Sequence, residues 1–197
     1  NVQCGFLHIL HRNLDGSASD AQMQIIREAQ LEICQEDSWF KRLPDCYDLD
    51  MVDQSHFTTA INQTTLPTRM AKAIAYYFKK IPVAGVFGPE VTAAAFNGDH
   101  LLLTVAHDAG TDFATIPSLA ENTVGLEIGS TVYKPSSVTR VNATQLKCDF
   151  ENKGLTDGAL GKAKIVYGAM QPLSLTSAEV IKDNASDARP LRSKVMS

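Results

Sequence analysis

The chain of 197 residues has no long hydrophobic run and no strong excess of one charge. No apolar stretch approaches the roughly 20 residues that a membrane-spanning helix needs. No basic segment followed by a hydrophobic block opens the N-terminus, so we expect neither a membrane anchor nor an export signal. The formal net charge is only −4, with acidic and basic residues mixed along the sequence. Neither nucleic acid nor an anionic membrane is therefore an expected partner.

Cysteine is scarce, and its spacing does not indicate a metal site. No C-x-x-C pair is present, and no histidine stands at zinc-finger spacing from a cysteine. We therefore expect no bound metal. Free buried thiols are favoured over disulfides, although both remain open, for Cys4, Cys34, Cys46 and Cys148.

The chain does contain enough hydrophobic residues, 44% of the total, for a buried core in one domain or two small ones. Residues 5–10 form a continuous apolar run, which predicts a strand covered on both faces. Ser19 and Gln22 make a capping-box pattern, so a helix is expected from there to about Cys34. Residues 47–52 are short enough to form a strand or an extended approach to a site.

Two segments carry apolar residues at helical spacing, and the second is the clearest element of the chain. Thr64 or Thr65 can cap this second helix, with Pro67 in its first turn. Its apolar residues recur as on one side of a helix: Leu66, Met70, Ala73, Ile74, Tyr77 and Phe78. The face shared in the first helix comprises Ile26, Ala29, Ile33 and Cys34, with Ile25 alongside.

Beyond Pro82 the helical spacing gives way to short β-like runs separated by turns, so a domain boundary is expected there. The sequence Asn97-Gly98-Asp99 is a strong hairpin signal. Strands at this spacing favour a β-sandwich over residues 82–172, and residues 173–197 are expected to form an extended tail over one of the domains. The expected strands are Val91–Phe96, Leu101–Ala106, Gly125–Ile128, Thr131–Lys134, Ser137–Val141, Gln145–Phe150 and Lys162–Tyr167.

Asp53 and His56, spaced D-x-x-H before the second helix, form the most informative pattern. A serine hydrolase needs a base within hydrogen-bond reach of its nucleophile and an acid that fixes the tautomer of that base. Two residues three apart in a turn can supply this pair without long-range packing. An arbitrary D-x-x-H is more often a turn aspartate beside a solvated histidine, so the hypothesis depends on the surrounding sequence.

The other histidines and the aromatic clusters have simpler interpretations. A single histidine without a carboxylate or cysteine partner is usually packed or solvated, which we expect of His8, His11, His100 and His107. The pair His107-Asp108 could bind an ion, but nothing in the sequence requires it. Core or interface packing is favoured over a sugar platform for the aromatic runs Trp39-Phe40 and Tyr76-Tyr77-Phe78.

The surroundings of His56 resemble the last sequence block of the SGNH (GDSL-like) hydrolases. An acidic cluster leads into H-F-T-T-A and then into a helix containing R-M-A; its members are Asp48, Asp50 and Asp53. The segment Q-I-I-R-E-A-Q-L that begins at Gln24 is similar to the I-R-x-A-Q helix of the sialate O-acetylesterase-like branch. Similarity to the C-terminal region of those enzymes continues at Gly88-Pro89, at V-Y-G from Val166 and at Arg189-Pro-Leu-Arg192.

This resemblance implies an α/β fold class, with residues 1–81 as the C-terminal part of a flavodoxin-like SGNH hydrolase layer, followed by an all-β sandwich-like domain. It implies that His56 is the catalytic base and Asp53 its orienter, with no metal or organic cofactor. The implied substrate is an acylated carbohydrate, most often one bearing an O-acetyl group. An extracellular, lysosomal or virion-surface location is expected rather than a cytoplasmic one.

The nucleophile of such an enzyme is not found in this chain. Asp15-Gly16-Ser17 lacks the Gly-Asp-Ser order, and only 38 residues separate Ser17 from His56, too few for several strand–helix units of about 30 residues each. We therefore expect an N-terminal segment or a second chain to supply the serine and the oxyanion-hole residues. The alternative is a non-catalytic carbohydrate-binding or structural module on an esterase-like scaffold, as in a viral tail or capsid appendage or a cell-surface protein.

Overall fold

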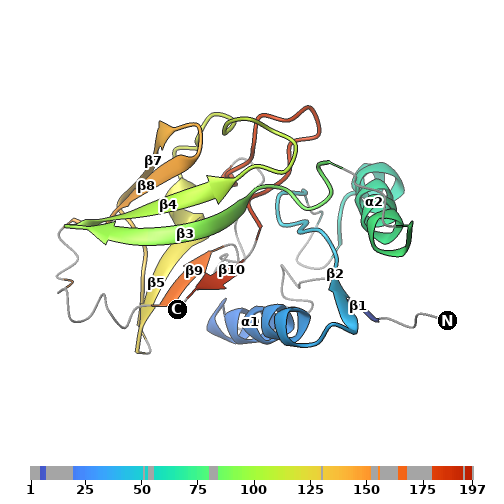
Figure 1. Ribbon diagram of the computed structural model, residues 1–197, viewed down its shortest axis with the longest axis horizontal. Helices are drawn as coiled ribbons and strands as arrows, with labels where there is room; N and C mark the ends of the chain where they lie inside the picture. The colour runs from blue at the N-terminus through green and yellow to red at the C-terminus, as the bar shows by residue number, and fades with distance from the viewer. Residues whose placement is uncertain are drawn as a thin grey trace.

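A short parallel β–α–β unit opens the computed structural model of the chain (Figure 1). Strand β1 (Gly5–Leu7) pairs in parallel with β2 (Phe40–Arg42), and helix α1 (Asp20–Glu36) lies between them in sequence. Parallel strands need such a crossover connection. The predicted first strand and first helix are thus confirmed where they can be followed, whereas β2 was not predicted.

The structure describes residues 5–7, 20–50, 52, 56–79, 84–129, 131–151, 155, 164–167, 179–192 and 194–196.

The second helix begins earlier than the sequence predicts. It starts at Thr59, passes through a π-helical turn η1 (Ile61–Thr65) and continues as α2 (Leu66–Lys79). The capping hydroxyl belongs to Thr58, whose Oγ1 accepts the N–H of Ile61 over 3.4 Å. Thr64 instead donates its hydroxyl to the Ala60 carbonyl over 2.6 Å. Neither Thr64 nor Thr65 is therefore the cap, and the prediction of a helix start there is wrong.

Two antiparallel sheets of four strands make up the rest of the described fold. Each of the seven predicted strands is present, with bounds that differ by at most one residue, while residues 162 and 163 of the last predicted strand lie outside the described residues. Gly98 has a φ of +61° between β3 and β4, as the predicted hairpin requires. One sheet has the order β3 (Glu90–Asn97), β4 (His100–Ala106), β8 (Gln145–Asp149), β7 (Ser137–Asn142). The other has the order β10 (Lys194–Met196), β9 (Lys164–Tyr167), β5 (Val124–Ile128), β6 (Thr131–Tyr133), with a 3-10 turn η2 (Ala120–Thr123) before β5.

One hydrophobic core lies among these strands. Along β4 and β8, buried residues alternate with partly exposed ones, because successive side chains of a strand point to opposite faces. Side chains of β3, β4, β5, β7 and β8 meet in the same cluster, which residues of the C-terminal segment complete. Its buried members are Val91, Leu101, Leu103, Val105, Phe113, Ala120, Val124, Leu126, Val138, Leu146, Cys148, Phe150, Ile181 and Leu191.

Residues 179–192 join the α/β part to the two sheets. The Tyr47 hydroxyl donates a hydrogen bond to the Leu191 carbonyl, and Val180 packs against the same tyrosine. Lys72 of α2 forms an ion pair with Asp187 over 2.9 Å. Helix α1 in turn contacts β10 (Figure 1). The C-terminal segment therefore contacts both parts of the chain.

Among the described residues, no helix is long and apolar enough to cross a membrane.

Close backbone packing at Gly88 leads to a stability prediction. Gly88 has a φ of +86°, and a Cβ added there would lie 2.5 Å from the Pro190 carbonyl oxygen and 2.7 Å from the Arg189 Cβ. Gly98 also has a positive φ but nothing within 4 Å of such a Cβ. We expect Gly88→Ala to lower the free energy of unfolding by about 2–3 kcal/mol and Gly98→Ala by about 1 kcal/mol. Urea titration of both variants measures the difference, and equal losses would contradict the packing described.

Candidate active site around His56

His56 lies in an exposed loop immediately before the second helix. The backbone N–H of Val52 donates to the His56 carbonyl over 2.8 Å, and the N–H of Thr58 donates to the Asp50 carbonyl over 3.3 Å. These two bonds close the base of the loop from which His56 leads into the helix. Asp53 lies outside the described residues, and its contact with the imidazole stays a prediction.

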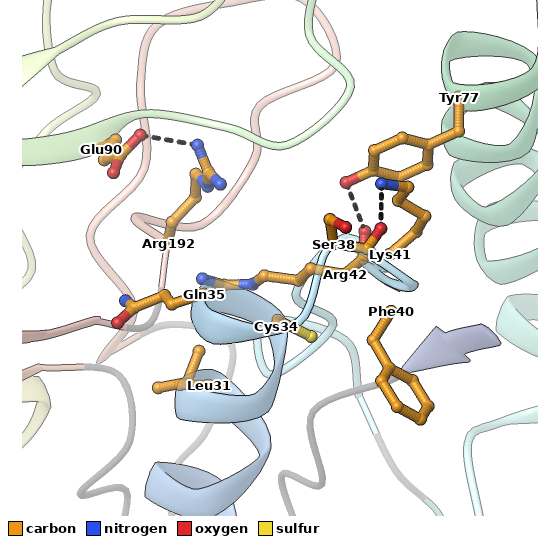
Figure 2. A pocket seen from close by; sticks show the side chains of 10 residues that line it. All are labelled: Leu31, Cys34, Gln35, Ser38, Phe40, Lys41, Arg42, Tyr77, Glu90 and Arg192. Carbon is orange, nitrogen blue, oxygen red and sulfur yellow. Dashed lines mark hydrogen bonds and ion pairs between the residues drawn. The ribbon is translucent and has the colours of Figure 1, made fainter. Parts of the chain in front are cut away.

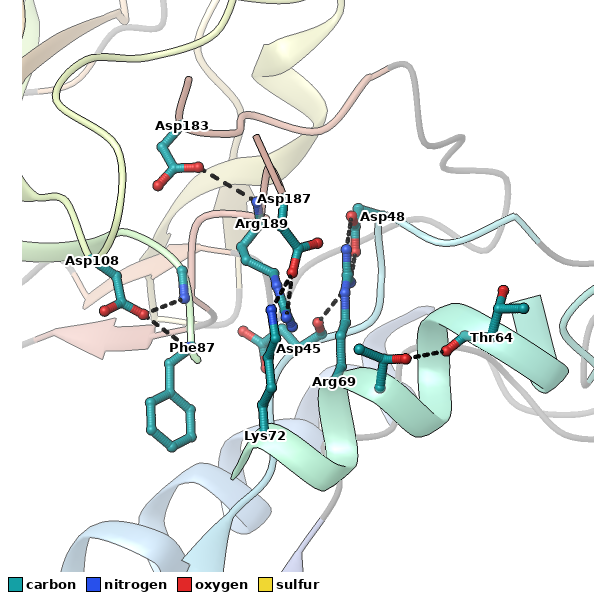
Figure 3. Close-up of polar contacts among 12 residues, drawn as sticks. Asp45, Asp48, Thr64, Arg69, Lys72, Phe87, Asp108, Asp183, Asp187 and Arg189 are labelled. Atoms are coloured by element: carbon teal, nitrogen blue, oxygen red, sulfur yellow. Dashed lines mark hydrogen bonds and ion pairs between the residues drawn. The ribbon is translucent and has the colours of Figure 1, made fainter. Parts of the chain in front are cut away.

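The segment that leads into this loop is buried throughout residues 44–49, although it is rich in charge. Figure 3 shows how Asp48 faces Arg69 of α2. Arg69 donates from Nη1 to Asp48 Oδ1 over 2.5 Å and from Nη2 to Oδ2 over 2.8 Å, and both residues are only 3% exposed. Lys182 adds a second cation 3.4 Å from the same carboxylate. An ion pair with two hydrogen bonds therefore fixes the segment that precedes the His56 loop.

A second carboxylate, Asp45, strengthens the same anchor. Its side chain accepts a hydrogen bond from Arg42 over 2.6 Å, and its carbonyl accepts one from Arg69 over 3.3 Å. Burial, the largest single influence, lowers the pKa of Arg69, but the hydrogen bonds and charge of Asp48 together with the interactions of Cys46 outweigh burial and leave that pKa raised. The guanidinium thus stays charged and ties the segment before the loop to the helix that follows it.

Sequence reasoning did not identify this anchor. Arg69 occupies a position on the apolar side of α2, between Leu66 and Ala73, where an unpaired charge is costly. Its spacing after an acidic cluster was the available signal, because a buried arginine requires carboxylate partners. Residues 47–49 form a turn, so the strand considered for residues 47–52 is absent from the described part of that segment.

The described cysteines are thiols, which agrees with the favoured alternative. Cys34, Cys46 and Cys148 form no disulfide, and Cys4 lies outside the described residues. Burial raises the pKa of Cys46 to about 12, although Arg69 opposes the shift, and burial also raises the pKa of Cys148 to about 12. Neither thiol can act as a nucleophile near neutral pH, because only the thiolate is reactive.

Alkylation should reveal these raised pKa values. At pH 8 a thiol with a pKa of about 12 is ionised to about one part in ten thousand. We therefore expect iodoacetamide to modify Cys46 and Cys148 about a thousandfold more slowly than the same residues in the urea-unfolded chain. The half-buried Cys34 should react faster than either. Peptide mass mapping measures each rate, and rapid modification of Cys46 in the folded protein would contradict its burial.

A cavity of about 280 Å³ lies where α1, β2 and α2 meet the β-sheets (Figure 2). Its charged side chains already have partners within the protein. Arg192 donates to Glu90 over 2.7 Å, Lys41 donates to the Ser38 carbonyl over 2.5 Å, and Arg42 pairs with Asp45. This arrangement indicates a polar junction between the two parts of the chain.

A further cavity of about 260 Å³ lies beside α2 and is lined by Thr64, Thr65, Thr68, Arg69 and Asp187.

The remaining residues singled out in the sequence have structural roles where they are described. His107 forms a 2.7 Å hydrogen bond with the Ala143 carbonyl, while Asp108 accepts the N–H groups of Phe87 and Gly88 over 2.9 and 3.2 Å. The pair thus faces different partners, and no cluster of three metal-ligating side chains occurs in the described ranges. Tyr76 and Tyr77 pack against Phe87 at the junction, as predicted, whereas Phe78 and Trp39 are 52% and 49% exposed and depart from the predicted packing. Residues His8, His11 and Ser17 lie outside the described parts of the chain.

Comparison with known proteins found a similar fold in a solved structure. No protein-family model matches the chain, and no curated protein matches it either. Among solved structures, a carbohydrate acetylesterase from Xanthomonas citri is similar, with a TM-score of 0.63 at 11% sequence identity. The similarity covers 98% of this chain and 40% of the acetylesterase chain. At this identity the likeness shows the fold alone: helices and antiparallel sheets arranged compatibly with an esterase fold.

Proposed function

We propose that this chain is the C-terminal part of a serine esterase that removes O-acetyl or similar acyl groups from carbohydrate. The observation that carries the proposal is the exposed His56, which follows a buried ion-pair anchor in a D-x-x-H loop. The fold adds support, because a carbohydrate acetylesterase contains a similar arrangement over two-fifths of its length. We assign the chain to the SGNH hydrolases, in the sialate O-acetylesterase-like branch, on the sequence blocks around His56 and Gln24.

In the proposed mechanism, His56 is the general base and Asp53 fixes its tautomer. His56 accepts the proton of a serine hydroxyl as the serine oxygen bonds to the acyl carbon, and it then donates that proton to the departing sugar oxygen. In the second half of the reaction, water attacks the acyl-serine while His56 accepts a proton from that water, and His56 then returns the proton to the serine oxygen as the bond to the acyl group breaks and the free acid leaves. The serine and the oxyanion-hole donors come from outside these 197 residues. This chemistry uses no metal or organic cofactor.

The remaining parts of the chain have supporting roles in this proposal. Residues 1–81 form the last part of the hydrolase layer. Residues 82–172 form an accessory β-sandwich, and residues 173–197 form a C-terminal tail. Support for the sandwich is that two four-stranded antiparallel sheets contribute to a single hydrophobic core. The ion pair between Lys72 and Asp187 supports a bracing role for the tail, since it links the tail to the helix after His56.

The proposal predicts that the isolated 197-residue chain has no esterase activity. A base without its nucleophile cannot form the acyl-serine, so hydrolysis of an aryl acetate should proceed at the buffer rate. The assay compares the wild-type chain with Ser17→Ala, which tests the one Asp-Gly-Ser turn near the start of the sequence. Robust hydrolysis that Ser17→Ala abolishes would place the nucleophile inside this chain and contradict the proposal.

A second candidate function follows from the absent nucleophile. A chain with no serine in a Gly-Asp-Ser turn could be a non-catalytic carbohydrate-binding or structural module that keeps an esterase-like scaffold, as in a viral tail or capsid appendage or a cell-surface protein. The discriminating observation is whether an upstream segment with a Gly-Asp-Ser turn belongs to the same protein. Its presence favours the enzyme, whereas its absence, together with binding of an acylated polysaccharide without hydrolysis, favours the module.

A further inference from the structure

Another cavity, of about 270 Å³, lies at the end of α2 that is remote from His56, where this helix meets the loop before β3. Tyr76 of α2 and Phe87 of that loop both line it, and their rings meet edge to face with 5.5 Å between the centroids. Tyr76 is nevertheless 40% exposed. Since a water molecule occupies about 30 Å³ in the liquid, the volume suits a ligand unit the size of a single ring.

Two polar side chains on the wall of this cavity have acceptor atoms that the described chain does not use. Nε2 of His107 lies 2.7 Å from the Ala143 carbonyl, which only accepts hydrogen bonds, so in the neutral ring Nδ1 is an acceptor. That Nδ1 is buried and has no partner among the described residues. Both hydrogen bonds to Asp108, from the N–H groups of Phe87 and Gly88, go to Oδ2 (Figure 3), so Oδ1 remains as a second acceptor.

Arg192 contributes unused donors to the same wall. Its Nη1 donates to Glu90 over 2.7 Å, and its guanidinium lies 5.2 Å from the centroid of the Phe87 ring. Its Nε is buried and unpartnered within the described ranges. Most buried polar atoms have a hydrogen-bond partner. The unused Nε of Arg192 and Nδ1 of His107 therefore indicate a bound molecule that both accepts and donates hydrogen bonds.

A neutral sugar unit has the chemistry that this wall requires. Each of its hydroxyl groups can donate and accept at once, and its C–H faces can pack against the rings of Tyr76 and Phe87. The wall carries two carboxylates, Glu90 and Asp108, against one guanidinium, so an additional negative charge on the ligand is disfavoured. An apolar aromatic surface with a few placed polar groups is the usual composition of a small-ligand site.

We propose that this cavity binds one neutral sugar unit of a carbohydrate chain, at a site separate from His56. Tyr76 lies about 25 Å along the helix axis from Thr59, where the helix begins, at a rise of about 1.5 Å per residue. One sugar unit cannot reach both places, so only a polysaccharide engages this site and the His56 loop together. The binding site is independent of the proposed function, and only the preference for a polymeric ester rests on it.

Binding to an array of immobilised neutral and acidic oligosaccharides tests the site in the complete protein. The background is His56→Ala, so that bound esters stay intact. We expect binding to neutral oligosaccharides, weakened about tenfold by Tyr76→Ala because the flat aromatic surface is lost. Tyr76→Leu keeps apolar bulk beside Phe87 and removes only the flat ring, so it should weaken binding similarly and decides the question if Tyr76→Ala does not fold.

Phe78→Ala is the matched control. Phe78 is 52% exposed, and at 100° per residue it projects from the opposite side of α2 to Tyr76. This variant should leave the binding unchanged. The proposal is overturned if no neutral oligosaccharide binds, if binding is confined to acidic ones, or if the Tyr76 variants bind as well as Phe78→Ala.

Kinetics with His56 intact separate this inference from the proposed function. The ratio of kcat/KM for an acetylated polysaccharide to that for an acetylated monosaccharide should fall about tenfold in Tyr76→Ala, because only the polymer gains from a second contact. Binding through Tyr76 in a protein that hydrolyses no ester would sustain the site and defeat the esterase assignment. An active esterase whose oligosaccharide binding is independent of Tyr76 would do the reverse.

Discussion

On the proposed esterase function, His56→Ala in the complete protein should lower kcat/KM for an acetylated sugar by about four orders of magnitude or more. Without the imidazole, no group accepts the serine proton as the serine attacks, and none returns a proton to the leaving oxygen. Because His56 lies in an exposed loop, its removal leaves no cavity, and the urea midpoint should stay near that of wild type. Steady-state kinetics and urea titration on the same preparation measure both quantities.

Two variants sharpen this test. Asp53→Asn should cost about as much, near 10⁴-fold, since an amide leaves the imidazole in the wrong tautomer. Gln63→Ala changes an exposed polar side chain of the neighbouring helical turn and should leave kcat/KM unchanged. Near-wild-type turnover in His56→Ala would remove both Asp53 and His56 from the catalytic assignment.

Arg69→Ala should lower the free energy of unfolding by about 3–5 kcal/mol, the largest stability effect expected in this chain. The substitution leaves Asp48 buried with Lys182 as its remaining cation at 3.4 Å. It also removes the link between α2 and the segment that leads into the His56 loop. We therefore expect kcat to fall as well, because the base is less firmly positioned.

An exposed ion pair that also makes two hydrogen bonds is the matched control for Arg69. Arg140 binds Asp112 through Nε and Nη2 over 2.7 and 2.6 Å, but both side chains are open to solvent. Exposed pairs contribute little to stability, so Arg140→Ala should leave the urea midpoint near that of wild type. Equal midpoints for Arg69→Ala and Arg140→Ala would show that the buried pair does not anchor the loop.

The antiparallel part of the fold could be predicted from the sequence because its signals are local. Burial alternates along β4 and β8, in β8 together with the residue types, and the turn at Gly98 carries its own signature. Strand β2 was not predicted, because a strand of three residues is too short to show an alternating pattern of polar and apolar residues. Its partner β1 also lies more than thirty positions earlier in the sequence. The helix start was misplaced because Thr58 and Thr64 are equivalent caps in sequence, and only the π-helical turn distinguishes them.

The catalytic pair of Asp53 and His56 stays a prediction from their spacing, because Asp53 lies outside the described residues. The spacing of Asp53 and His56 indicates a base and its orienter, and the structure places His56 in an exposed loop closed by two backbone hydrogen bonds. The ion pair of Asp48 with Arg69 depends on a contact between residues 21 positions apart. The position of Arg69 on the apolar side of α2 indicates burial beside a carboxylate, but no local pattern specifies which carboxylate it contacts.

Active-site labelling of the complete protein with a fluorophosphonate, followed by peptide mapping, tests the central claim most directly. A fluorophosphonate bonds only to a serine whose hydroxyl is activated by a base. We predict that the label attaches to a serine outside these 197 residues and that His56→Ala abolishes the labelling. A label on Ser17 or on any other serine of this chain, or undiminished labelling of the His56→Ala protein, would contradict the account.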